Sequence, residues 1–117
     1  MAERIPTPPR PSEAMQAASE VTPEFQRFVR EFVQGQIMQR PELDRRTRLL
    51  CAISVLAALG RELQLKVHIA SALRADIPKD EIIEALLQVL VYAGFPATWN
   101  GLLAAREMFA EHEAAGR

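Results

Sequence analysis

The sequence has little glycine and almost no cysteine: its 117 residues include five Gly and a single cysteine, Cys51. One cysteine excludes an intramolecular disulfide, a CxxC redox pair and a zinc site built from cysteines. The chain also lacks a glycine-rich phosphate loop, an HExxH motif and a serine nucleophile elbow. We therefore expect no nucleotide, metal or thiol-redox chemistry, and a reducing compartment suits the chain best.

An excess of charge of one sign is also missing. The chain has fourteen Lys and Arg residues and fifteen Asp and Glu residues, and the two signs are interspersed along it. Nucleic-acid and anionic membrane partners are not expected from such a pattern. No run of about 18 apolar residues is long enough to cross a bilayer, and the first residues lack the features of a signal peptide. These absences predict a cytoplasmic protein.

Hydrophobic residues make up 49% of the chain, which is enough for one domain with a single core. Ala and Leu dominate and no alternating strand pattern occurs, so the fold class is predicted to be all-α. Four prolines within residues 1–11 block regular structure there. We therefore divide the chain into a proline-rich arm and lead-in, residues 1–21, and a helical domain, residues 22–117.

Five helices are predicted inside the helical domain from apolar spacing and from the residues that start and stop helices. Pro23 opens the first, Asp44 is a capping residue before the second, and Gly60 and Gly94 end the second and fourth. The predicted spans are about 23–38, 44–59, 61–75, 79–93 and 96–113.

The predicted helix 79–93 has almost no polar face in its second half. A helix that is apolar on all sides must be buried on all sides. A chain of this size has few helices with which to surround another one, so we expect a second subunit to cover it. The pattern thus predicts a homo-oligomer.

His68 is the candidate catalytic residue. Arg61, Gln64 and Ser71 share its face of the predicted helix 61–75, so these side chains can converge on one pocket. A solvated helix face that happens to include a histidine is the alternative, and spacing alone favours it.

Two further groups are candidates for binding. One is a set of arginines, which can hold a carboxylate through their forked guanidinium groups but can also pair with Glu42 and Asp44 on the surface. The other is Tyr92 and Trp99, which flank the Gly94 turn and either wall a pocket or belong to the core. The arginines are Arg40, Arg45, Arg46 and Arg48.

The stretch from Phe25 to Phe109 resembles the gamma-carboxymuconolactone decarboxylases, part of the wider alkylhydroperoxidase-like superfamily. The similar pieces follow one another in this order: FQRFVREFVQG, RPELDRRTRLL, LAALGRELQLKVHIASAL, IPKDEIIEALLQVLVYAGFPA and AAREMF. The resemblance implies an alkylhydroperoxidase-like helical bundle with a central helical hairpin, assembled as a trimer or hexamer. It also implies a pocket close to a subunit boundary.

The same resemblance implies a carboxy-lyase that needs no cofactor and acts on a small carboxylated lactone or related acid. His68 matches the family's histidine and is the implied acid, while Arg40 and Arg48 match its RP and TR positions and are the implied carboxylate-binding residues. In the substrate, the electrons left behind by carbon dioxide can flow through the ring alkene into the lactone carbonyl. The protein has to hold the carboxylates, stabilise the oxyanion and return a proton to carbon.

The chain departs from the family pattern at two places. Arg61 and Gln64 stand where peroxidase relatives carry CxxC, so a thiol peroxidase is not expected. Trp99 and Leu103 stand where decarboxylases carry an asparagine and a histidine, which makes that wall bulkier and drier. An alternative is therefore a relative that performs another proton transfer, such as isomerisation or cyclisation, on a more apolar substrate. A non-catalytic helical oligomer or binding module is the third hypothesis.

Overall fold

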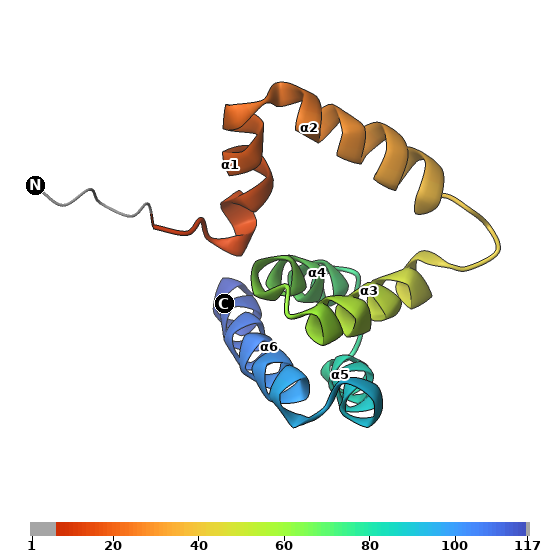
Figure 1. The fold of residues 1–117 in the computed structure, drawn as a ribbon, viewed down its shortest axis with the longest axis vertical. Helices are drawn as coiled ribbons and strands as arrows, with labels where there is room; N and C mark the ends of the chain where they lie inside the picture. The colour runs from red at the N-terminus through yellow and green to blue at the C-terminus, as the bar shows by residue number, and fades with distance from the viewer. Residues whose placement is uncertain (1–6, 117) are drawn as a thin grey trace, which may run out of the picture.

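A computed structural model describes residues 7–116, which contain helices and no strand. The all-α class is thereby confirmed. In Figure 1, the last four helices form a bundle and the first ones form an arc beside it. The elements are η1 (Pro11–Glu13, a 3-10 turn), α1 (Ala14–Val21), α2 (Pro23–Phe28), η2 (Val29–Ile37, a π-helix), α3 (Arg45–Leu59), α4 (Glu62–Arg74), α5 (Lys79–Ala93) and α6 (Phe95–Ala115).

The ends of the bundle helices lie where the sequence signals place them. The Asp44 side chain accepts a hydrogen bond from the Thr47 backbone N–H at 2.7 Å and so caps α3. This hydrogen bond also lowers the pKa of the Asp44 carboxyl. Gly60 and Gly94 follow α3 and α5 with φ angles of 73° and 90°, which favour glycine. Both helices therefore stop within one residue of their predicted ends.

The core lies between α3, α4, α5 and α6. Its largest fully buried side chains are Ile53 on α3, Ile69 on α4, and Ile82 and Leu86 on α5. α6 contributes mainly small residues, among them Ala104 and Ala105, to the same core. These small side chains let α6 pack closely on the other three helices.

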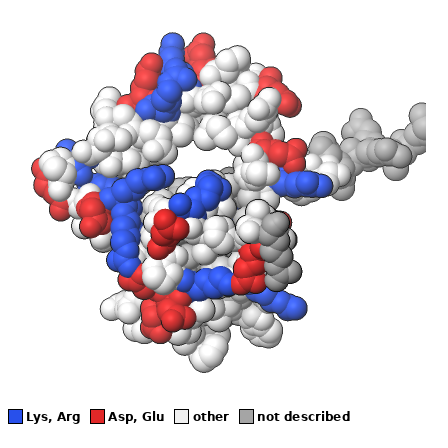
Figure 2. Space-filling view, turned by 180° about the vertical axis from the view of Figure 1, so that it is seen from behind, with Lys and Arg blue, Asp and Glu red and all other residues white. Residues whose placement is uncertain are grey.

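Polar groups tie the bundle together at a few points. Ser54 Oγ on α3 donates to the Ala85 carbonyl on α5 at 3.0 Å, and Thr98 Oγ1 on α6 donates to the Leu86 carbonyl at 3.0 Å. Lys66 on α4 pairs with Glu107 on α6 at 2.7 Å, and the hydrogen bond to Glu107 raises the pKa of the Lys66 ammonium. Figure 2 shows the two charge signs mixed over the surface seen from behind.

Gly101 lies at a close contact of α6 with α5. A Cβ atom placed on Gly101 would lie 2.9 Å from Leu86 Cδ2 and 3.5 Å from Ala57 Cβ. We expect Gly101→Val to lower the free energy of unfolding by about 1–3 kcal/mol, because Leu86 is fully buried and has little room to move. Urea unfolding followed by circular dichroism measures this. An unchanged or higher midpoint would contradict the close packing.

The arc formed by α1, α2 and η2 packs mainly on itself, and η1 is the part that packs on α4. Figure 2 shows an opening between the arc and the bundle. Helix α1 was not among the predicted helices, and the predicted helix 23–38 divides into α2 and a π-helical segment. Its apolar stripe is exposed in the single chain: Phe25, Phe28, Phe32, Val33 and Ile37.

The apolar second half of α5 is only partly covered within one chain. Val89 is buried, whereas Val91 is 70% exposed and Tyr92 is 82% exposed. The prediction that another subunit covers this face stays a prediction. Among residues 7–116, no helix is both long enough and apolar enough to cross a membrane.

Candidate active site

A cavity of about 980 Å³ lies between the N-terminal segment and helices α4 and α6. Its volume is at the upper end of the 300–1,000 Å³ or so typical of small-molecule sites. Helix α4 contributes His68 to the lining, and α6 contributes the second histidine of the chain, His112. The polar and charged residues around the cavity are Ser12, Gln64, His68, Arg74, Glu111 and His112.

His68 is held in one orientation by its own helix. Its Nδ1 lies 2.8 Å from the backbone carbonyl oxygen of Gln64, one turn earlier. A carbonyl oxygen only accepts, so Nδ1 carries the hydrogen and donates it. Nε2 is therefore the nitrogen that can exchange a proton with a molecule in the cavity.

The face of α4 that points to the cavity follows from the face that it buries. Leu65, Ile69 and Ala72 lie in the core, and His68 with Gln64 occupies the adjoining face at the cavity. Of the residues predicted to share the site with His68, Gln64 does so. Arg61 lies before the start of α4, outside the cavity lining.

Arg74 gives the cavity a positive charge that the sequence analysis missed. Its Nη2 donates to Ser71 Oγ at 3.2 Å, so the predicted Ser71 takes part through Arg74. Glu111 and His112 on α6 were also missed. Met108, Glu111, His112 and Ala115 do share one helix face by their spacing, yet spacing does not say which helix that face meets.

The two arginines predicted to bind carboxylates lie away from this cavity. Arg48, in the first turn of α3, donates through Nε to the Leu43 carbonyl at 3.0 Å and through Nη2 to the Arg40 carbonyl at 3.3 Å. It thus holds the link between η2 and α3. Arg40 is exposed in that link, and Arg46 pairs with Glu81 on α5 rather than with a neighbouring acid.

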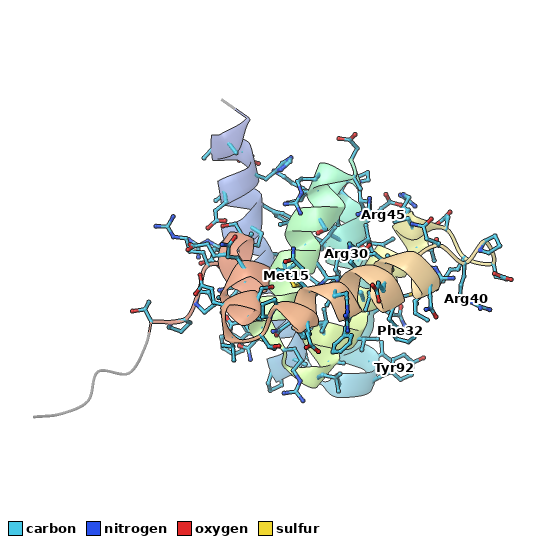
Figure 3. All side chains as sticks on the ribbon, turned by 90° about the horizontal axis from the view of Figure 1, so that it is seen from above. Met15, Arg30, Phe32, Arg40, Arg45 and Tyr92 are labelled. Carbon is cyan, nitrogen blue, oxygen red and sulfur yellow. The ribbon has the colours of Figure 1, made fainter. Side chains whose placement is uncertain are left out.

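The predicted aromatic wall lies at another end of the bundle. Tyr92, Trp99 and Leu103 are 82%, 67% and 50% exposed and do not line the cavity of their own chain. Figure 3 shows Tyr92 and Arg40 well to one side of Met15, which does line it. One chain alone therefore brings His68 together with Arg74 and His112, but not with the five predicted binding residues.

Cys51 differs in one respect from its predicted surroundings. Its position in an apolar run suggested apolar neighbours that disfavour a thiolate, whereas its side chain is exposed on α3. Helix periodicity explains this, because Leu49 and Ile53 take the buried positions on either side. Within the described part of the chain, no group of three or more His, Cys, Asp or Glu side chains is placed to hold a metal ion.

Comparison with known proteins decides the family. The model of the carboxymuconolactone decarboxylase family matches residues 23–107. The chain belongs to this family. The matched region contains His68 and Arg74, and it leaves out the N-terminal lead-in and the last residues of α6. The match thus covers α3, α4, α5 and the first part of α6, with the α4 side of the cavity, while the α6 residues of the lining, His112 among them, and most of the N-terminal wall lie outside it.

Two relatives have names that state a decarboxylase activity. The chain is 41% identical over 86 residues to the 4-carboxymuconolactone decarboxylase of Acinetobacter baylyi, which is 74% of this chain and 64% of that protein. It is 30% identical over 90 residues to the nitrosuccinic acid decarboxylase of Metarhizium robertsii, covering 77% and 63% of the two chains. In both cases the match spans slightly less than two thirds of the relative.

A third relative carries no activity in its name. It is an uncharacterized 15.0 kDa protein of Paracoccus denitrificans, 32% identical over 101 residues, which cover 85% of this chain and 75% of that protein.

Proposed function

We propose that this member of the carboxymuconolactone decarboxylase family is a carboxy-lyase that works without a cofactor on a small carboxylated lactone or related acid. The observation that carries the proposal is the cavity itself, in which the oriented imidazole of His68 and the guanidinium of Arg74 line the same space. The names of two relatives support the reaction type.

The two substrates in those names have one chemical feature in common. In carboxymuconolactone the departing carboxylate leaves its electron pair on a carbon conjugated, through the ring alkene, with the lactone carbonyl. In nitrosuccinate the nitro group can accept the pair left on its own carbon. In both cases the carbon–carbon bond breaks, carbon dioxide leaves, and an oxyanion forms without help from a cofactor. The protein then has to stabilise that anion and protonate carbon.

His68 is proposed to supply the proton. With Nδ1 engaged by the Gln64 carbonyl, a protonated imidazole directs its Nε2–H at the cavity and passes that proton to the carbon that lost the carboxylate. Arg74 is proposed to hold an anionic group of the substrate, since its guanidinium is kept at the cavity by Ser71.

Arg40, Arg48, Tyr92, Trp99 and Leu103 remain proposed binding residues, and their position suggests how they take part. They lie outside the cavity of their own chain, and four of the five are exposed. We propose that the chain forms a homo-oligomer, a trimer or hexamer, in which a neighbouring copy brings these side chains to the site. The proposed cytoplasmic location depends on sequence features only.

A second candidate function is another proton transfer, such as isomerisation or cyclisation, on a more apolar acid. The observation in its favour is the apolar N-terminal side of the cavity, together with Trp99 and Leu103 in place of polar residues. In this case Nε2 of His68 moves a proton between substrate atoms and no carbon dioxide is released.

Release of carbon dioxide separates these functions. We expect the purified protein to release carbon dioxide from carboxymuconolactone, from nitrosuccinate or from both at a steady rate at least about 100 times that of the buffer alone. A coupled carbonate assay measures it, with heat-unfolded protein as the control. No release from either acid would overturn the decarboxylase proposal in favour of the second candidate or of a non-catalytic helical oligomer.

A further inference from the structure

The cavity at His68 has two chemically different walls. Helices α4 and α6 contribute every charged or imidazole side chain of the lining, including Arg74 and His112. The N-terminal segment, residues 9–25, contributes a wall in which Ser12 is the one polar residue. The apolar residues of that wall are Pro9, Pro11, Ala14, Met15, Ala17, Ala18 and Phe25.

Most of this apolar wall lies outside the part of the chain that the family shares. The family match begins at residue 23, whereas six of the seven apolar wall residues lie between Pro9 and Ala18. The segment is joined to the bundle through η1, which packs on α4, and residues of α1 line the cavity. The α4 side of the cavity, with His68 and Arg74, therefore belongs to the shared domain, whereas the facing wall is added by the lead-in.

An apolar wall favours an apolar part of a ligand over a charged one. Apolar side chains contribute about 25 cal/mol per Å² of apolar ligand surface that they remove from water, and they offer a second carboxylate no partner. The cavity volume of about 980 Å³ also leaves space beyond a five-membered lactone ring. Arg74 is the one cationic side chain of the lining that is always charged.

We propose that residues 9–25 are the specificity-determining wall of the site and that, among the acids it accepts, the site favours one with a single carboxylate end and an apolar body over a dicarboxylate. The carboxylate lies toward Arg74 and His68, and the apolar body lies against α1, on Met15 and Ala18. This inference rests on the proposed function for the identity of the site, but it concerns binding and not the reaction that follows.

The test compares two probes of the same chain length by isothermal titration calorimetry of the full chain. Octanoate has one carboxylate and an apolar body, and suberate has a carboxylate at each end of a chain with the same number of carbons. We expect octanoate to bind at least about ten times more tightly than suberate. Met15→Gln, which makes the wall polar, should weaken octanoate binding about fivefold or more and weaken suberate binding less.

Val21→Gln is the matched control, because Val21 lies on the same helix, is 87% exposed and does not line the cavity. It should leave octanoate affinity unchanged. Ala18→Trp places a large side chain in the cavity and should abolish octanoate binding, with helicity checked by circular dichroism. The proposal is overturned if suberate binds as tightly as octanoate, if octanoate does not bind, or if Met15→Gln has no more effect than Val21→Gln.

These outcomes are distinct from a failure of the proposed function. Calorimetry needs no turnover. If the protein releases no carbon dioxide but shows the expected octanoate preference, the decarboxylase proposal is refuted and the proposed role of residues 9–25 is supported. If the protein decarboxylates but shows no preference for octanoate, the proposed function is supported and the proposed role of residues 9–25 is refuted.

Discussion

His68→Ala is expected to lower the turnover number of the protein by a factor of about 100 or more, with little change in helicity or assembly. The imidazole is proposed to place its Nε2–H at the carbon that loses the carboxylate, and loss of a positioned acid costs about 10²–10⁴-fold. His68 is only partly buried and lies beside the core rather than in it, so the fold should tolerate the change. Steady-state kinetics at saturating substrate measure the effect.

Asp80→Asn is a suitable control, since Asp80 is exposed in the first turn of α5 and does not line the cavity. It should keep nearly full turnover. If His68→Ala retains more than about a third of the wild-type turnover while circular dichroism shows intact helices, another group supplies the proton.

Val91→Glu is expected to split the oligomer into smaller species. Val91 is 70% exposed within one chain, beside Tyr92 on the apolar half of α5. If a second subunit covers this face, the change removes about 1.5–3 kcal/mol of apolar burial and adds the cost of desolvating a carboxylate at each contact. Dissociation constants between subunits should therefore rise at least about tenfold.

Multi-angle light scattering at micromolar concentration measures this change. Gln16→Glu adds the same charge to an exposed position on α1, outside the apolar half of α5, and should leave the assembly intact. A wild-type protein that is monomeric and well folded at these concentrations would contradict both the oligomer and the proposed contribution of Arg40, Trp99 and Leu103 from a neighbouring copy.

The bundle helices were predictable because each depends on local signals. Asp44 can cap α3 wherever the helix packs, and Gly60 and Gly94 can take positive φ angles without help from other helices. The arc was less predictable. Helix α1 follows a proline-rich stretch that suggested an irregular arm, and the π-helical turns of η2 need no particular residue type.

The site was predictable only in part, since it depends on which helix faces meet. Gln64 could be expected beside His68 from helix spacing alone. Arg74 and His112 come to the cavity through the packing of α4 against α6, which no local pattern fixes. The exposure of Tyr92 and Trp99 has a related cause, because whether an apolar side chain is core or surface depends on what covers its helix.

A structure of the protein with a bound substrate analogue tests the central claim most directly. The analogue should be an acid that cannot lose its carboxylate, such as the saturated form of the lactone. We predict that it lies in the cavity between α1, α4 and α6, with the ring carbon that bears the departing carboxylate about 3–3.5 Å from Nε2 of His68. An analogue bound away from His68, or one that meets His68 only through Nδ1, would contradict the account.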